Sequence, residues 1–287
     1  MDNTEELPTV LSFCSGYGGI ERGLDLIGVK HRVIAYVEIE AYAIANLVAK
    51  MESGELASAP IYTNLKTFPS EVFRDRVDII TGGYPCQPFS AAGMRKGTED
   101  ERHLWPHIRR HIQTIRPAQC FFENVQGHIS LGLSTVISDM GEDGYRATWG
   151  IFSASEVGAS HERKRVFILA DTTSSRFKEH GYSKSDDAIK ASEIMADSMR
   201  EGLARRWIYE SGSRKKFSEH ILHGQTFPSG RGSKPYDWER TRLKPRVGRA
   251  DDGFAHKVDR LRLLGNGIVP QTAAKAWYIL NDRNQGE

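Results

Sequence analysis

The sequence has no apolar run near the roughly 18 residues that a membrane-spanning helix needs, so it predicts no association with a membrane. Its first residues, Met1 to Pro8, are acidic and lack the apolar core of a signal peptide. Only three cysteines occur, and Cys14, Cys86 and Cys120 lie far apart. This scarcity excludes a disulfide framework and a cysteine-ligated zinc cluster. We therefore expect a protein of the reducing cytoplasm that holds no metal.

The chain also has little net charge, but its charges are unevenly distributed. Its 39 Lys and Arg residues face 37 Asp and Glu residues, a net charge of +2. Between Arg200 and Arg249, however, 13 basic residues face 5 acidic ones, so this segment carries +8 and the remainder −6. A basic segment on a mildly acidic body is typical of a protein with a polyanionic partner such as nucleic acid. The alternative is a loop whose charges are merely solvated.

The 287 residues suffice for one large domain or two smaller ones. Apolar runs alternate with amphipathic stretches, which predicts an α/β fold around a mainly parallel sheet. The pattern breaks between Asp171 and Ala255, where a basic, loop-rich insert is expected. The expected strands are Thr9–Phe13, Val33–Val37, Pro60–Leu65, Val77–Thr81, Cys120–Phe122, Arg146–Ser153 and Val166–Ala170, and the expected helices are Ile20–Ile27, Ala41–Met51, His103–Ile115, Leu131–Met140 and Gln271–Leu280.

A glycine-rich turn, Cys14 to Gly19, follows the first expected strand and opens a helix. Strand, glycine turn and helix together are typical of a nucleotide-binding α/β unit. The G-x-G-G spacing is not the dinucleotide G-x-G-x-x-G, so NAD is not predicted. Glu38 ends the second strand, 19 residues after Gly19, where a carboxylate can accept hydrogen bonds from both ribose hydroxyls. The alternative for Glu38 is a capping or solvated acid.

A stiff loop follows the expected strand Val77–Thr81. Gly82 and Gly83 come first, and Pro85 and Pro88 then bracket the lone Cys86. Proline fixes its own φ and restricts the residue before it, and open α/β sheets place their chemistry at the carboxyl ends of strands. Cys86 is therefore a candidate nucleophile, or else a small apolar residue in a tight turn. Glu123 follows the next expected strand and reaches the same sheet edge.

Five short signatures occur in one order along nearly the whole chain. They are Ser15–Gly19, Pro85–Gln87, Glu123–Val125, Arg163–Arg165 and Gly265–Gly267. In this order, with a variable basic segment between the fourth and the fifth, the chain resembles the cytosine-C5 DNA methyltransferases, in particular their short phage and bacterial members. The resemblance implies a Rossmann-like, S-adenosylmethionine-dependent domain with a small, loop-rich target-recognition insert.

The resemblance also implies a catalytic set. Cys86 matches the family's nucleophile, which adds to C6 of a flipped-out cytosine and forms a covalent adduct. Glu123 matches the glutamate that contacts cytosine N3 and the exocyclic amine. Arg163 or Arg165 would supply the positive charge that favours the thiolate, and the alternative for both is a charge pair flanking a strand.

S-adenosylmethionine is the implied cofactor. Glu38 would hold its ribose, and Ile39 would pack on its adenine. Asn64 stands where the family usually has an aspartate that faces the adenine amine. The full set of implied cofactor-binding residues is Phe13, Cys14, Ser15, Gly16, Tyr17, Gly18, Gly19, Glu38, Ile39, Asn64, Leu65, Pro85, Leu104, Asn266 and Ile268.

By the same resemblance, residues 1–171 form the catalytic and cofactor-binding domain, 172–257 the target-recognition domain, and 258–287 a return segment that completes the catalytic domain. Double-stranded DNA is the expected partner, with a cognate restriction endonuclease acting separately. We expect a monomer in the cytoplasm of a bacterium or of a phage-infected host. Restriction-modification and phage protection both fit as the biological role.

Two other functions stay open from the sequence. The first is a tRNA cytosine-C5 methyltransferase, but that branch usually carries Cys-Phe-Thr soon after Glu-Asn-Val, and here Gln126-Gly127-His128 follows. The second is a catalytically silent DNA-binding homologue, against which the intact Cys86 and Glu123 argue. Binding of DNA without binding of S-adenosylmethionine would favour the silent homologue.

Overall fold

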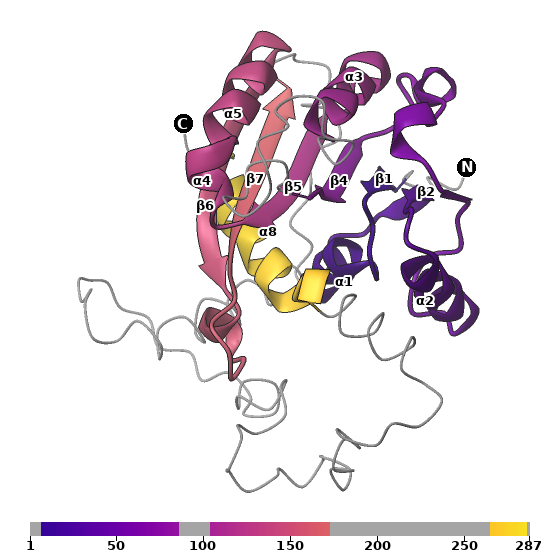
Figure 1. The fold of residues 1–287 in the computed structure, drawn as a ribbon, viewed down its shortest axis with the longest axis horizontal. Coiled ribbons are helices and arrows are strands. Elements are labelled where there is room, and N and C mark those ends of the chain that lie inside the picture. The colour runs from indigo at the N-terminus through magenta and orange to yellow at the C-terminus, as the bar shows by residue number, and fades with distance from the viewer. Residues whose placement is uncertain (1–6, 86–103, 173–264, 286–287) are drawn as a thin grey trace, which may run out of the picture.

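The computed structural model describes residues 7–85, 104–172 and 265–285. They form a seven-stranded sheet with helices on both of its faces (Figure 1). This arrangement confirms the predicted α/β, Rossmann-like fold. The predicted basic insert and the predicted return to α/β character at Val258–Leu264 lie outside the described residues.

The strand order of the sheet is β3-β2-β1-β4-β5-β7-β6. Strands β1 to β5 are parallel to their neighbours, whereas β7 runs antiparallel to both β5 and β6. The order reverses between β1 and β4, and in open α/β sheets such a reversal opens a ligand-binding crevice at the carboxyl ends of the strands. The strands are β1 Thr9–Phe13, β2 Arg32–Val37, β3 Ile61–Tyr62, β4 Ile79–Gly83, β5 Gln119–Val125, β6 Tyr145–Ser153 and β7 Lys164–Thr172.

Helices α1 and α8 lie side by side on one face of the sheet, and α3 and α5 cover the other (Figure 1). The close approach of α1 and α8 explains a glycine inside α1, because a Cβ on Gly23 would lie 2.7 Å from the carbonyl oxygen of Pro270. Within the described ranges, no helix combines the length and apolarity needed to cross a membrane. The helices are α1 Gly19–Leu26, α2 Ala41–Glu52, α3 Trp105–Ile115, α4 His128–Leu131, α5 Leu133–Glu142 and α8 Pro270–Gln285, with short 3-10 turns at Leu65–Thr67, Ser70–Phe73 and Ser155–Val157.

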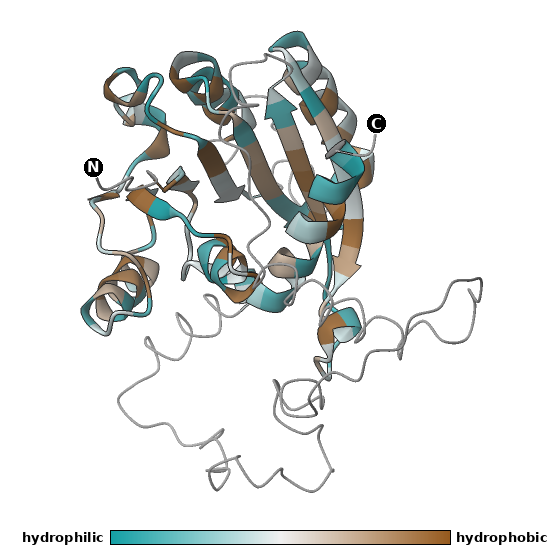
Figure 2. Ribbon diagram, turned by 180° about the vertical axis from the view of Figure 1, so that it is seen from behind, coloured by the Kyte–Doolittle hydropathy of each residue, from teal (hydrophilic) through white to brown (hydrophobic). Residues whose placement is uncertain are grey.

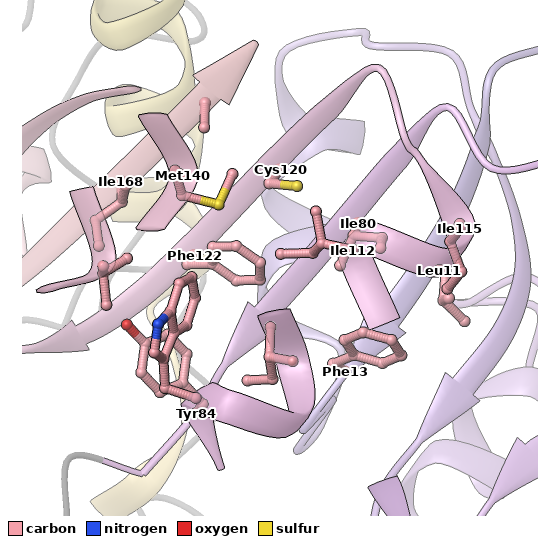
Figure 3. Packing of buried hydrophobic residues seen from close by; sticks show 14 of the residues in the cluster. Leu11, Phe13, Ile80, Tyr84, Ile112, Ile115, Cys120, Phe122, Met140 and Ile168 are labelled. Atoms are coloured by element: carbon pink, nitrogen blue, oxygen red, sulfur yellow. The ribbon is translucent and has the colours of Figure 1, made fainter. Parts of the chain in front are cut away.

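Side chains of the central strands alternate between two buried clusters, one on each face of the sheet. Phe13 and Phe122 pack with Ile112 of α3 on one face (Figure 3). On the other face, Phe121 meets Trp277 of α8 with their ring centroids 5.1 Å apart. Burial on both faces explains why the strands read as nearly continuous apolar runs, drawn brown through the middle of the sheet in Figure 2.

Most predicted elements differ from the structure by a few residues at their ends. Strand β5 runs from Gln119 to Val125, so Glu123 lies within the strand and does not follow it as predicted. Strand β4 continues through Gly82 and Gly83, because both glycines still pair with β5, so the glycines do not end the strand. The predicted helix Leu131–Met140 is instead two helices, since Gly132 adopts φ −170° and ψ −8° and breaks the helical path. The third strand is reduced to two residues, and a 3-10 turn takes the chain onward from there.

Candidate active site

The residues predicted to carry the chemistry gather where β4 and β5 end. Gly83 of β4 is the register partner of Glu123 of β5, so both reach the same point of the carboxyl edge. A Cβ on Gly83 would lie 3.4 Å from Oε2 of Glu123. Cys86 itself lies outside the described residues, but the chain leads to it from this edge only three residues after Gly83.

An ion pair joins Glu123 to Arg165 across two antiparallel strands. The register places Val125 opposite Arg165, so Glu123 is the diagonal neighbour of Arg165 on one face of the sheet. Nε of Arg165 lies 2.8 Å from Oε1 of Glu123, and both side chains are largely buried. Burial raises the pKa of Glu123 to about 7, although Arg165 and then Arg163 oppose the rise. This carboxyl group therefore exchanges its proton near neutral pH.

Arg163, two residues away, has different partners. It sits directly before β7 with φ 34° and donates hydrogen bonds to the carbonyl oxygens of Gly265, at 2.8 Å, and Gly267. Burial, and then the neighbouring Arg165, lower the pKa of its guanidinium group. Lys164, between the two arginines, forms an exposed ion pair with Glu162 at 2.7 Å. The three basic residues of this signature thus have three separate environments.

The glycine turn packs closely against the segment that precedes α8. Gly16 and Gly18 have φ values of 56° and 77°, which residues with a side chain rarely adopt. A Cβ on Gly19 would lie 2.6 Å from the carbonyl oxygen of Ile268, so only glycine allows this approach. Next to it, the hydroxyl group of Tyr17 donates a hydrogen bond to the same carbonyl oxygen.

Glu38 is held in a fixed orientation at the end of β2. Its Oε2 accepts the N–H of Gly16 at 2.7 Å, and its Oε1 accepts the N–H of Glu40 at 2.9 Å. Each oxygen keeps lone-pair capacity for one more donor, which suits two adjacent ribose hydroxyls. The following residue, Ile39, is apolar and 73% exposed, as a surface that packs on a purine ring would be. These residues fit the nucleoside part of S-adenosylmethionine.

The family model described as C-5 cytosine-specific DNA methylase matches residues 9–243. The chain belongs to this family. The match confirms the resemblance drawn from the sequence signatures, four of which lie within it, and the fifth, Gly265–Gly267, follows its end.

Named relatives agree with this assignment. The chain is 30% identical over 198 residues to Type II methyltransferase M.NgoMIV of Neisseria gonorrhoeae, covering 67% of the chain and 61% of the relative. It is 34% identical over 163 residues to Type II methyltransferase M.CviJI of Paramecium bursaria Chlorella virus IL3A, covering 56% and 42%. The chain thus spans less than two thirds of the length of these relatives.

One solved structure supports the fold. A mutant of DNMT2 from Spodoptera frugiperda superposes with a TM-score of 0.50 at 22% sequence identity, covering 60% of this chain and 52% of that one. At this identity the likeness concerns the fold alone.

The C-5 cytosine-specific DNA methylase family is expected to use one cysteine as its nucleophile, and two of the three cysteines here are unsuited to that role. Burial, and then the charge of Glu38, raise the pKa of Cys14 to about 12. Burial also raises the pKa of Cys120 well above its usual range. Both side chains therefore stay neutral thiols at physiological pH, which leaves Cys86 as the candidate.

Asn64, where the methylase family usually has an aspartate, begins the 3-10 turn Leu65–Thr67. Its Oδ1 accepts the N–H of Lys66 at 2.9 Å, so part of its acceptor capacity is used within the turn. The remaining expected cofactor residues differ in how far they are exposed. Leu65 is buried and Leu104 half-buried, whereas Pro85 and Asn266 are exposed. Phe13 is fully buried in the core, so it can offer only backbone to a ligand.

A buried histidine, which the sequence analysis did not identify, fixes the turn that contains Leu65. Nε2 of His111 lies 2.6 Å from the carbonyl oxygen of Leu65, and its Nδ1 pairs with the hydroxyl group of Ser70. A carbonyl oxygen only accepts, so Nε2 carries the proton and Nδ1 accepts from Ser70. Burial lowers the pKa of His111, which keeps the ring neutral.

A second hydrogen-bonded group supports the chain just before Cys86. The side chain of Asn124 donates to the carbonyl oxygen of Tyr84 at 3.1 Å, and the Tyr84 hydroxyl group pairs with Nε2 of His128 at 3.0 Å. Burial lowers the pKa of His128 to about 4. Tyr84 and His128 are 44 residues apart, and no sequence signal links them.

In the described part of the chain, no three His, Cys, Asp or Glu side chains come close enough to share a metal ion.

Proposed function

We propose that this chain transfers a methyl group from S-adenosylmethionine to C5 of cytosine in a short sequence of duplex DNA. The observation that carries the proposal is the buried Glu123–Arg165 pair, with Glu123 at a pKa of about 7, at the edge from which the chain leads to Cys86. Membership in the C-5 cytosine-specific DNA methylase family selects this reaction among those that an acid and a thiol can perform.

In the proposed mechanism, the Cys86 thiolate attacks C6 of a cytosine that has been flipped out of the duplex. The S–C6 bond forms as the C5–C6 double bond opens, and the electron density released makes C5 nucleophilic. N3 gains basicity in this step, and Glu123 in its protonated form donates a hydrogen bond or the proton itself to N3. Arg165 holds the Glu123 carboxyl group in place. Once C5 carries the methyl group, loss of the C5 proton to a base expels the Cys86 thiolate from C6, and the proton at N3 returns to Glu123, which restores the aromatic ring.

S-adenosylmethionine, when bound, supplies the methyl group that C5 receives. The chain's own residues would orient it. Glu38 would accept hydrogen bonds from the ribose hydroxyls, and Ile39 would cover one face of the adenine. The open space around Gly16, where an added Cβ would meet nothing within 4 Å, leaves room for the methionine part beside the glycine turn.

DNA that carries 5-fluorocytosine in the target sequence should trap the proposed adduct. Fluorine at C5 cannot leave as a proton does, so after methyl transfer the S–C6 bond persists. We expect a covalent complex of protein and DNA on a denaturing gel, and it should form only when S-adenosylmethionine is present. The Cys86→Ser variant is the control. A complex of equal yield with that variant would show that another group attacks the ring.

Residues 172–257 are proposed as the target-recognition domain. The basic residues of this segment would mainly hold phosphates, and one or two arginines would read guanine, each contributing about 1–3 kcal/mol of discrimination. Exchange of residues 172–255 for the equivalent segment of another family member should therefore change which sequence is methylated. Methylation of the original sequence by the exchanged protein would assign recognition to another part of the chain.

The named relatives suggest a biological role for the proposed methyl transfer. The relatives include Type II methyltransferases and an orphan methyltransferase of Bacillus phage rho11s, 30% identical over 167 residues. We propose that the chain protects DNA from a cognate endonuclease that acts separately, in a bacterium or in a phage-infected host, and that it acts as a monomer. Digestion of DNA from expressing cells with endonucleases of known specificity tests this role, and unprotected DNA would contradict it.

A further inference from the structure

Two side chains from distant parts of the sequence converge on residues 265–268, the segment before α8. The Tyr17 hydroxyl group donates to the carbonyl oxygen of Ile268, and the Arg163 guanidinium group donates to those of Gly265 and Gly267. The two side chains are separated along the chain by most of the described sheet. Three of the four carbonyl oxygens in this short segment therefore accept a hydrogen bond from one of these two side chains.

We propose that Tyr17 and Arg163 are positioning residues that clasp residues 265–268 against the glycine turn and so form one wall of the cofactor site. The inference rests on the proposed function for the identity of that cofactor. Arg163 then acts through residues 265–268 and not on the cytosine, which separates its role from that of Arg165.

The geometry of each donor suits a clasp. A guanidinium group presents several N–H donors in a fixed plane, so one arginine can bridge the carbonyl oxygens of Gly265 and Gly267, whereas an ammonium group acts as a single point charge. Tyr17 is itself fixed, because Lys50 donates to its carbonyl oxygen at 2.8 Å and lies 4.6 Å from the centre of its ring.

The clasped segment fits closely against its surroundings. A Cβ on Gly19 would lie 2.6 Å from the Ile268 carbonyl oxygen, and a Cβ on Gly83 would lie 2.9 Å from Cδ1 of Ile268. Ile268 thus lies between the glycine turn after β1 and the end of β4. These two strand ends flank the crevice expected where the strand order reverses. A small displacement of Ile268 would change both walls of that crevice.

Residues 265–268 are anchored in a different way from the strands beside them. Strand β7 ends at Thr172, whose N–H donates to the carbonyl oxygen of Ala118 at the amino end of β5. Gly265, the next residue that the structure describes, is held by Arg163 at the carboxyl edge. Residues 265–268 belong to none of the seven strands, so the side chains of Tyr17 and Arg163 supply the anchor that backbone pairing gives to the strands.

The test compares Tyr17→Phe and Arg163→Lys with a matched control, Tyr145→Phe. Tyr145 also donates its hydroxyl to a carbonyl oxygen, that of Pro117 at 2.8 Å, but at the opposite edge of the sheet. Hydrogen exchange is measured on peptides covering residues 265–275 without cofactor, and the affinity for S-adenosylmethionine is measured by calorimetry. Both readouts are independent of methyl transfer.

We expect faster exchange in this segment for both clasp variants. The dissociation constant should rise about two- to fivefold for Tyr17→Phe, as loss of one hydrogen bond predicts, and about tenfold for Arg163→Lys, which weakens two charge-assisted bonds. The control should change neither readout. Exchange and affinity at wild-type levels in both variants would overturn the clasp, as would weaker DNA binding by Arg163→Lys with unchanged exchange. A wild-type chain that binds no S-adenosylmethionine would instead overturn the proposed function, while exchange would still test the clasp.

Discussion

Replacement of Cys86 by serine should reduce methyl transfer to duplex DNA by at least about a thousandfold. A hydroxyl group ionises far less readily than a thiol, so serine supplies almost no nucleophile near neutral pH. The transfer of labelled methyl groups from S-adenosylmethionine to DNA measures the effect. Binding of S-adenosylmethionine should persist, because the residues proposed to hold its nucleoside, Glu38 and Ile39, are untouched.

Cys120→Ala is the control for the loss of a thiol. Cys120 is fully buried in the core, and its pKa is raised well above the usual range, so it cannot supply a thiolate. Its replacement leaves a small cavity at some cost in stability but should leave turnover intact in the folded protein. Undiminished transfer by Cys86→Ser, or loss of transfer by Cys120→Ala at full foldedness, would refute the assignment of the nucleophile.

Glu123→Gln should lower the turnover number by about a hundredfold to ten-thousandfold. The amide keeps the shape of the side chain and can donate a hydrogen bond to N3, but it cannot deliver a proton as the ring accepts charge. The measurement is single-turnover methyl transfer at saturating cofactor and DNA. A loss below threefold would exclude proton donation by Glu123.

The pH dependence gives a second test of Glu123. Its pKa is raised to about 7, so the protonated, donating form disappears as the pH rises through neutrality. The fraction of the attacking thiol that is ionised changes in the opposite sense and increases as the pH rises. The two titrations together predict a bell-shaped rate profile for the wild-type protein, whose shape Glu123→Gln should alter by removing the carboxyl titration.

The same titration has a consequence for stability. A carboxyl group whose pKa is higher in the folded protein than in the unfolded chain binds more protons in the folded state. The free energy of unfolding therefore falls as the pH rises from about 4.5 towards 7. Glu123→Gln should remove this part of the pH dependence, which denaturant unfolding at several pH values would detect.

The sequence predicted the sheet because its strands are buried on both faces and its turns are marked by glycine. The ordered signatures also placed Glu123 at the edge that leads to Cys86. The predicted bounds of the strands were less accurate at glycines, which can either end a strand or continue it. Gly82 and Gly83 were predicted to end their strand, but both pair with β5. The break at Gly132 could have been expected from the glycine itself.

The different partners of Arg163 and Arg165 could not be predicted from the sequence. Their spacing indicates a common side of the strand, but their partners depend on the β5–β7 register and on the position of residues 265–268 before α8. The clasp by Tyr17 and the hydrogen bond between Tyr84 and His128 depend likewise on contacts between distant segments. Such contacts leave no periodic trace in a single sequence.

The most direct test of the central claim is bisulfite sequencing of DNA from cells that express this chain, beside cells that express Cys86→Ser. The account predicts that cytosines within one short motif resist conversion in the first sample and are converted in the second. Complete conversion in both samples, with the protein folded and able to bind S-adenosylmethionine, would contradict the assignment as a DNA cytosine-C5 methyltransferase.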